Sequence, residues 1–298
     1  MAGSEASAGF AEGVPCWIDA QLPDVEAGKR FYGGLFGWTF EPFDEMEETT
    51  GPSPGAPRSS AAPGSSAAPG SPGSPGSPGS PGSPGSLESP APAAYAGPSP
   101  YAGSVRAHLD GRPVAALVPK RDGRMPTVWT VYFATPDAED LADRIREAGG
   151  QVITAPVPVG PYGTMALAAD PESAVFGLWE GGTLPGFGRR HGPGSFSWVE
   201  LYARDTAVAD SFYTGLFHDA LFGPGTTRDF GRVLVTEAFP AEMPPHFLVH
   251  FGVEDCEALL GTVVRLGGRV QAPPFDTSYG RVAVVTDNQG ASFALLQT

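Results

Sequence analysis

The sequence predicts an α+β protein of four β-α-β-β-β modules that pair into two curved, half-open sheets with the helices outside. Three observations predict this fold. A sequence motif that starts at Trp17, here called the first phrase, recurs 181 residues later at Trp198. A second motif that starts at Phe133, the second phrase, recurs 118 residues later at Phe251. Around each phrase, strand-like and helix-like hydrophobic patterns follow one another in the same order. A repeat at this spacing indicates a tandem duplication.

The two phrases fix the limits of the copies. The identical residues in the first copy are Trp17, Asp24, Phe31, Tyr32, Gly34, Leu35, Phe36, Phe133, Asp137, Glu139, Leu141, Gly149, Gly150 and Val152. A later group, which starts at Tyr162-Gly163, recurs after 117 residues at Tyr279-Gly280. We therefore predict a first domain over residues 14–185, a linker rich in Gly and Pro over 186–194, and a second domain over 195–298.

Two segments are predicted to be disordered. The spacing of the repeats falls from 181 to 118, so the first copy holds 63 more residues between its phrases. Most of them form a segment at 51–100 that contains six consecutive Pro-Gly-Ser triplets. Such a segment has almost no apolar side chains with which to offset the entropy of ordering. Residues 1–13 are small and polar and are predicted to be a disordered tail.

The elements of the first module follow from local patterns. Cys16–Leu22 alternates in polarity and is predicted to be a strand. Asp24 can cap the amphipathic helix predicted over Val25–Phe36, and Gly37 can end it. Three strands complete the module at Trp38–Phe43, Ser104–Leu109 and Arg112–Val118, and the last two are joined by the hairpin turn Asp110-Gly111.

The same order then restarts. The second module is predicted to hold strands at 127–135, 151–156, 164–169 and 174–180, with a helix at 138–148. The second copy repeats both modules, but its first half is shorter. Between His218 and Phe247 there is room only for a reduced hairpin, and its clearest strand is Arg232–Thr236.

Composition restricts the partners. The chain has 33 acidic and 18 basic residues and a formal net charge of −15, which argues against nucleic acid and anionic membranes. Cys16 and Cys256 form no metal or disulfide pattern, as expected for reduced thiols. The first residues lack a basic region and a hydrophobic segment, so we expect no secretion signal, and no apolar run reaches membrane-spanning length. We expect a cytoplasmic protein whose partners are a small-molecule ligand and, within the chain, the paired tandem domains.

These features resemble the vicinal oxygen chelate superfamily, which includes glyoxalases, bleomycin resistance proteins and extradiol dioxygenases. The resemblance rests on the paired modules, the Pro-Asp step into a helix bearing Phe-Tyr, the run Leu-Phe-Gly-Trp and the Asp-Pro-Glu turn before the last strand. It covers nearly all of the chain outside the tail, insertion and linker. The tandem form is similar to a two-domain actinobacterial-type subgroup. Fold alone does not fix the chemistry.

The resemblance also implies where a divalent metal ion would be bound. Metal-dependent relatives carry ligands on the first and last strands of the paired modules. The matching positions here hold Trp17, Thr130 and Gly177 in the first copy, and Trp198, Leu248 and Ala294 in the second. Indole and aliphatic side chains cannot ligate such an ion. We therefore predict no metal and no other cofactor, with a divalent metal as the family alternative.

One pair of residues suggests a different metal site. His246 and His250 have the i, i+4 spacing of a helical ligand pair, but Phe247, Val249 and Phe251 alternate with them as in a strand. Four strand residues span about 13 Å, which is too far for one ion. We predict that the two histidines lie in or beside a cleft.

Asp19 and Glu200 are the candidate catalytic residues. They occupy matching positions two residues after the repeated tryptophan and share its strand face. A buried carboxylate on a cleft wall can act as a general base or bind a cationic group. The alternative is a structural carboxylate that accepts hydrogen bonds from backbone, Tyr or Arg.

Strand aromatics are the candidate ligand-binding residues. The set comprises Trp17, Trp129, Tyr132, Trp179, Trp198 and Phe247, together with His250. They can form a stacking floor for a flat organic ligand, or they can be part of the core. The matched loops at Tyr162-Gly163 and Tyr279-Gly280 either border the ligand mouth or are tight turns.

Three functional hypotheses follow. The first is metal-independent binding of a small aromatic or hydrophobic metabolite or drug in an aromatic-lined cleft. The alternative is a lyase, isomerase or dioxygenase-like enzyme that uses Asp19, Glu200 or a non-standard metal site. A third is an interaction scaffold in which one or both copies have lost their ligand.

Overall fold

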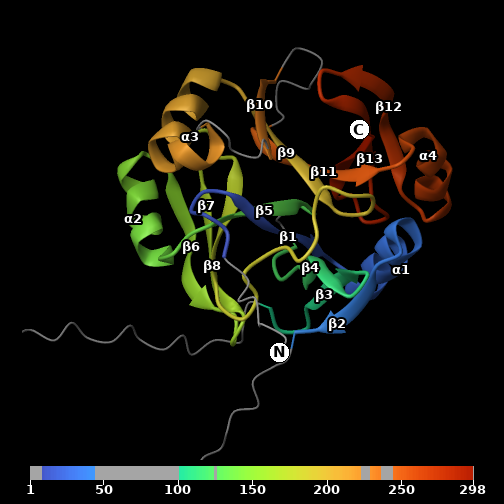
Figure 1. The fold of residues 1–298 in the computed structure, drawn as a ribbon, viewed down its shortest axis with the longest axis horizontal. Helices are drawn as coiled ribbons and strands as arrows, with labels where there is room; N and C mark the ends of the chain where they lie inside the picture. The colour runs from blue at the N-terminus through green and yellow to red at the C-terminus, as the bar shows by residue number, and fades with distance from the viewer. Residues whose placement is uncertain (1–8, 44–100, 124–125, 223–228, 236–243, 298) are drawn as a thin grey trace, which may run out of the picture. The chain divides into compact units, whose positions relative to one another are not determined.

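The computed structural model describes residues 9–43, 101–123, 126–222, 229–235 and 244–297. Within these ranges each copy forms one mixed β-sheet, and the helices lie beside the sheets (Figure 1). The predicted α+β fold of paired modules is confirmed. The insertion predicted at 51–100 and the first eight residues of the predicted tail lie outside the described residues.

The first sheet has the strand order β2-β3-β4-β1-β5-β8-β7-β6. Its two modules are joined where β1 pairs antiparallel with β5. Its elements are β1 (Pro15–Leu22), α1 (Val25–Phe36), β2 (Thr39–Pro42), β3 (Val105–Leu109), β4 (Arg112–Pro119), β5 (Trp129–Ala134), α2 (Ala138–Glu147), β6 (Gln151–Pro158), β7 (Gly163–Ala169) and β8 (Val175–Gly181).

The second sheet has the order β10-β9-β11-β14-β13-β12. Its elements are β9 (Phe196–Ala203), α3 (Thr206–Leu221), β10 (Phe230–Leu234), β11 (His246–Val253), α4 (Cys256–Arg265), β12 (Arg269–Thr277), β13 (Gly280–Thr286) and β14 (Ser292–Gln297). β10 pairs in parallel with β9 as β4 does with β1, so β10 corresponds to β4. The strand predicted at Arg232–Thr236 is confirmed as β10, two residues earlier. The remainder of the reduced hairpin expected between His218 and Phe247 falls largely on residues outside the described ranges.

The connection from α3 to β10 is much shorter than its counterpart in the first copy. Residues 222–229 separate the two elements, whereas residues 37–111 separate α1 from β4 in the first copy. Two strands of about five residues each, with a turn between them, cannot fit into so short a segment. Within the described residues, the second copy therefore has no counterpart of the β2–β3 hairpin.

Helix limits follow the predicted capping residues. Asp24 Oδ1 accepts a hydrogen bond from the Ala27 N–H at 2.9 Å at the start of α1. Gly37 ends the helix with φ 73°, a left-handed conformation that glycine adopts without strain. Asp137 and Asp255 cap α2 and α4 in the same way.

The linker and the end of the predicted tail are packed against the first sheet. In the linker, Phe187 N–H donates to the Cys16 carbonyl at 2.8 Å. In the tail, Phe10 lies edge-on to Phe187, with ring centroids 6.3 Å apart, and Gly13 N–H donates to the Ala134 carbonyl. The tail predicted over 1–13 is therefore too long, because residues 9–13 bind the domain.

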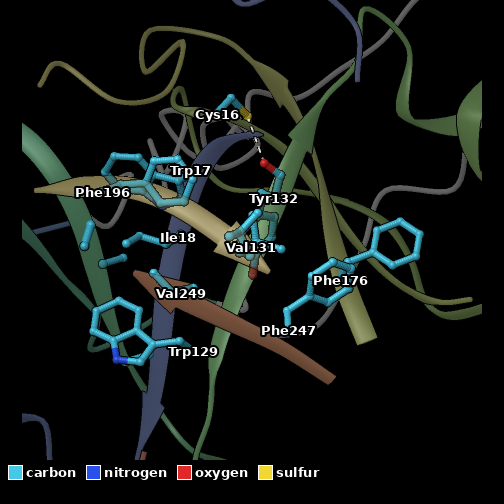
Figure 2. Packing of buried hydrophobic residues seen from close by; sticks show 14 of the residues in the cluster. Cys16, Trp17, Ile18, Trp129, Val131, Tyr132, Phe176, Phe196, Phe247 and Val249 are labelled. Atoms are coloured by element: carbon cyan, nitrogen blue, oxygen red, sulfur yellow. Dashed lines mark hydrogen bonds between the residues drawn. The ribbon is translucent and has the colours of Figure 1, made fainter. Parts of the chain in front are cut away.

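The two faces of each sheet have different surroundings. We call one the core face, which carries Ile18 and Trp129 in the first sheet and Phe247 and Phe251 in the second. The core faces contact each other, since Trp129 and Phe251 have ring centroids 5.1 Å apart. Figure 2 shows this packing around Trp129, Val249 and Phe247. The opposite face of each sheet is the cleft face.

The helices contact the other copy through the repeated residues. Tyr32 on α1 donates to Asp287 Oδ2 at 2.9 Å, in the turn before β14. Tyr213 on α3 donates to Asp170 Oδ2 at 3.1 Å, in the turn before β8. The first phrase of each copy thus contacts the later repeated group of the other copy, which gives both repeats a packing role.

Candidate ligand-binding clefts

Cleft one is the cleft face of the first sheet. Strand pairing places Trp17 beside Tyr132, and Tyr132 beside Gly177 on β8, so these residues share one face with Asp19 and Trp179. All four side chains are buried: Trp17 and Tyr132 are 0% exposed, and Asp19 and Trp179 are 1% exposed. The predicted aromatic floor therefore exists in this copy, but it is covered.

Three aromatic rings from loops cover cleft one, and we call them the plug: Phe43, Tyr101 and Tyr162. Phe43 lies 4.9 Å from Tyr101 and 5.0 Å from Tyr162 between ring centroids. The guanidinium of Arg106 on β3 lies 4.7 Å from the Tyr162 ring centroid. The β2–β3 hairpin and its flanking residues thus close this cleft with side chains of the protein itself.

Asp19 is held at the floor of cleft one by two hydroxyl groups. Tyr132 donates to Asp19 Oδ2 at 2.6 Å and Tyr101 donates to the same oxygen at 2.8 Å. Burial raises the pKa of the Asp19 carboxyl from 3.8 to about 6, although hydrogen bonds from these tyrosines and from Thr130 oppose the rise. With no solvent access, this geometry is that of a structural carboxylate.

Cleft two is the cleft face of the second sheet, and it is more open. Its residues are Trp198, Glu200, Tyr202, His246, Leu248, His250 and Tyr279. Trp198 and Tyr279 are half-buried, whereas the matching Trp17 and Tyr162 in cleft one are buried. The absence of a β2–β3 counterpart from the described residues of this copy accounts for the difference, because that hairpin supplies most of the plug in the first copy.

Glu200 and Tyr279 form the centre of cleft two. The Tyr279 hydroxyl lies 3.2 Å from Oε2 and 3.4 Å from Oε1 of Glu200. The Tyr279 ring stacks on Trp198 with centroids 5.3 Å apart and planes 24° from parallel. Burial raises the pKa of Glu200, while the Tyr202 and Tyr279 hydroxyls lower it. Glu200 as a whole residue is 9% exposed, whereas Asp19 is 1% exposed.

The histidines of β11 complete this cleft, and the predicted strand is confirmed. His246 stacks on Tyr202 with ring centroids 5.1 Å apart. His250 Nδ1 lies 3.1 Å from the Leu248 carbonyl oxygen, so Nδ1 carries the proton and Nε2 the lone pair. Burial lowers the pKa of His250 to about 4, so the ring is neutral near pH 7.

Two predicted ligand-binding residues lie on the wrong face. Trp129 is three residues from Tyr132, and Phe247 is three residues from His250, so each points to the opposite side of its strand. The indole Nε1 of Trp129 donates to the Tyr32 hydroxyl at 3.0 Å within the core. Figure 2 shows Phe247 beside Phe176, with ring centroids 6.3 Å apart. Both residues are core.

The metal positions implied by the superfamily do not fit an ion. In cleft two, the indole of Trp198 covers Gly231 on β10, where an added Cβ would lie 2.2 Å from the ring. Nε1 of Trp198, like that of Trp17, is buried with no hydrogen-bond partner among the described residues. Among those residues, no three His, Cys, Asp or Glu side chains converge on one point. The donors present are unsuited to a divalent cation.

Two surface hollows lie outside cleft two. One, of about 290 Å³, lies between α1 and α4 and is lined by residues that include Leu35, Phe36 and Leu259. The other, of about 260 Å³, lies beside Phe10 and Trp179. Neither contains the buried carboxylate or the half-buried aromatic stack of cleft two. We therefore place the candidate site in cleft two, where polar and aromatic groups converge.

Three residues of these clefts were missed as site residues from the sequence. Tyr101 follows the insertion directly, and no local pattern shows that it reaches Asp19. Tyr202 could have been found, because it lies two residues after Glu200 on one strand and so shares its face. The sequence left open whether the loop that holds Tyr279 borders the ligand mouth or is a tight turn. The stack of Tyr279 on Trp198 places it in cleft two.

Comparison with known proteins agrees with this architecture. The model of the Glyoxalase/Bleomycin resistance protein/Dioxygenase superfamily matches residues 17–176. The anthracycline biosynthesis protein DnrV of Streptomyces peucetius is 36% identical, over 97% of this chain and 94% of its own. The anthracycline biosynthesis protein DauV of Streptomyces sp. strain C5 is 34% identical over the same shares.

A solved structure shares the fold. The Mn(II)-bound glyoxalase from Novosphingobium aromaticivorans aligns with a TM-score of 0.53 at 12% identity, over 96% of this chain and 83% of its own. At that identity the likeness concerns the fold alone. No helix in the described ranges has the length and apolar character needed to span a membrane.

Proposed function

Because the chain belongs to the Glyoxalase/Bleomycin resistance protein/Dioxygenase superfamily, we propose that it binds a flat aromatic or hydrophobic small molecule in cleft two, without a metal ion. The observation that carries this proposal is the half-buried stack of Trp198 and Tyr279 beside the Glu200 carboxylate. Aromatic walls with a few convergent polar groups are typical of small-molecule sites.

The residues at the β12 edge of the second sheet favour a hydrophobic ligand. Phe275 on β12 pairs with Val282, whose side chain belongs to the apolar cluster of cleft two together with Leu248 and Leu296. Phe275 is 45% exposed, which is unusual for so large an apolar side chain. A ligand that extends from the stack toward β12 would cover this ring and gain apolar contact.

The relatives support the choice of ligand class. DnrV and DauV are named as anthracycline biosynthesis proteins, and each aligns with nearly the whole of this chain. An anthracycline carries a flat, fused anthraquinone ring system. Such a system matches an indole–phenol stack in shape, because offset stacked rings are a favoured aromatic arrangement. We therefore propose a fused-ring aromatic metabolite or drug as the ligand.

Titration of the purified full-length protein with 2-hydroxyanthraquinone tests this proposal. We expect saturable binding that is unchanged by EDTA, because the proposed site uses no metal. Trp198→Ala should weaken binding about tenfold or more, since a stacked aromatic pair is worth about 0.5–1.5 kcal/mol beyond its buried area. The matched control is Trp17→Phe in the covered cleft. Binding that EDTA abolishes, or that Trp198→Ala leaves intact, would contradict the proposal.

The raised pKa of Glu200 favours a second candidate, an enzyme in which Glu200 is the general base. Glu200 is largely buried, and burial makes its carboxylate a stronger base for removing a proton from a bound ligand. Incubation in D2O with an aromatic ketone that carries C–H bonds next to its carbonyl, such as 1-tetralone, followed by mass spectrometry, would reveal exchange at carbon. Exchange that is lost in Glu200→Gln supports this candidate, and its absence in the wild type excludes this role for the probe.

A further inference from the structure

The proposed ligand site in cleft two has a filled counterpart in the same chain. In cleft one the Tyr101 side chain comes from the segment before β3 and reaches over the sheet. Its hydroxyl donates to Asp19 Oδ2 at 2.8 Å, and its ring contacts Phe43 with centroids 4.9 Å apart. The side chain of Tyr101 is a para-substituted phenol. The first copy therefore shows how this scaffold holds a phenol against its carboxylate.

Glu200 is the counterpart of Asp19 in cleft two. The two residues lie 181 positions apart, at matching places on β9 and β1, and both face their cleft. Asp19 is 1% exposed beneath Tyr101, whereas Glu200 is 9% exposed. Glu200 accepts hydrogen bonds from the hydroxyls of Tyr202 and of Tyr279, the latter shared between its two oxygens at 3.2 and 3.4 Å. An ionised carboxylate has about four acceptor positions, so Glu200 can accept another donor.

The second acceptor in cleft two points to the same ligand chemistry. His250 occupies the position of Tyr132, which in cleft one donates to Asp19. The Nδ1–H of His250 donates to the Leu248 carbonyl, so the other ring nitrogen, Nε2, is an acceptor. At this position, cleft one has a hydrogen-bond donor and cleft two has an acceptor. A ligand that supplies hydroxyl donors complements this floor.

We propose that the ligand of cleft two is a phenol whose hydroxyl donates to Glu200, as the Tyr101 hydroxyl donates to Asp19. This inference rests on the proposed function, because it names the chemical class bound at the same site. The aromatic part of the ligand lies against the Trp198–Tyr279 stack, in the role that Phe43 has for Tyr101.

A matched pair of probes tests the inference. 2-Hydroxyanthraquinone and 2-methoxyanthraquinone share the ring system, but only the first can donate a hydrogen bond. Isothermal titration of the wild-type protein should show the hydroxy compound binding about ten- to a hundredfold more tightly, as expected for a hydrogen bond to a charged group. In Glu200→Gln the preference should fall to about threefold or less, because the acceptor is no longer charged.

The controls separate this inference from the proposed function. Asp19→Asn should keep the full preference, because its carboxylate lies in the covered cleft. A preference that persists in Glu200→Gln would reflect the extra methyl group and overturn the inference. Equal binding of both probes that Trp198→Ala still weakens would overturn the phenol assignment and leave the proposed function standing. Binding of neither probe would overturn both.

Discussion

The hydroxyl of Tyr279 lies 3.2 Å from Oε2 of Glu200. Its counterpart in the first copy, Tyr162, lies instead beneath the guanidinium of Arg106, 4.7 Å from the ring centroid. Arg106 belongs to β3, which has no counterpart among the described residues of the second copy. Where β3 is present, the tyrosine contacts Arg106 within the plug, and where no β3 counterpart is described, it contacts the carboxylate. The duplicated scaffold has one filled copy and one copy suited to a ligand.

This contrast predicts different effects for two matched substitutions. Tyr279→Ala should weaken binding of 2-hydroxyanthraquinone about tenfold or more with little change in stability, because the ring is half-buried and forms the stack. Tyr162→Ala should lower the free energy of unfolding by about 3 kcal/mol through loss of buried aromatic packing. Urea denaturation and titration of both variants check this. Equal loss of affinity in the two would contradict the division of roles.

Gly231 offers a second test of the stack. A Cβ at this position would lie 2.2 Å from the Trp198 ring, so Gly231→Ala should displace the indole and reduce affinity. The comparison is Gly177→Ala, where a Cβ would lie 2.1 Å from the Tyr132 ring in the covered cleft. That change should cost about 1–3 kcal/mol of stability through overpacking. If Gly231→Ala binds as tightly as wild type, the indole is not a wall of the site.

Asp19 predicts a pH dependence of stability. Its folded pKa of about 6 lies above the unfolded value near 3.8, so the folded protein binds a proton more readily. The carboxyl therefore costs stability above pH 6, and this cost disappears as the pH falls toward 4. The free energy of unfolding of Asp19→Asn, minus that of wild type, should therefore rise by about 3 kcal/mol from pH 4 to pH 8.

Urea denaturation of wild type and Asp19→Asn at several pH values measures this difference. The comparison removes the opposing contribution of His250, whose lowered pKa of about 4 makes stability fall as the pH drops below 6.5. A difference in the free energy of unfolding between the two proteins that does not change with pH would show that burial does not raise the pKa of Asp19.

The cross-copy hydrogen bonds predict that the two copies unfold together. Tyr32→Phe removes the donor to the buried Asp287 carboxylate and should cost about 1–3 kcal/mol. Tyr213→Phe removes the equivalent donor to Asp170 and should cost a similar amount. Both variants should keep one transition, with fluorescence and circular dichroism superimposed. A separate early transition of one copy would contradict this coupling.

Much of the fold could be predicted because its signals are local. Asp24 and Gly37 limit α1 at the predicted residues, and Asp110-Gly111 forms the predicted turn with φ values of 51° and 71°. The repeated Phe-Tyr and Asp residues recur because they pack against each other across the copies. Sequence alone identified the repeat but not this partner, since the contacts join residues 255 positions apart for Tyr32 and Asp287 and 43 positions apart for Tyr213 and Asp170.

The candidate site was predicted less well, for two physical reasons. Trp129 and Phe247 were grouped with cleft residues three positions away, although an odd separation on a strand reverses the face. The closure of cleft one depends on Tyr101, which reaches Asp19 across 82 residues of sequence. No local pattern encodes such a contact. The same alternation places Trp198 and Glu200 on one face of β9, and His250 on β11 pairs with Trp198.

A crystal structure of the protein with 2-hydroxyanthraquinone tests the central claim most directly. The account predicts a ring system against Trp198 and Tyr279, with its hydroxyl oxygen about 2.5–3.0 Å from a Glu200 carboxylate oxygen. Cleft one should stay covered by Tyr101. A ligand in cleft one, in the hollow between α1 and α4, or bound through a metal ion in cleft two would contradict the account.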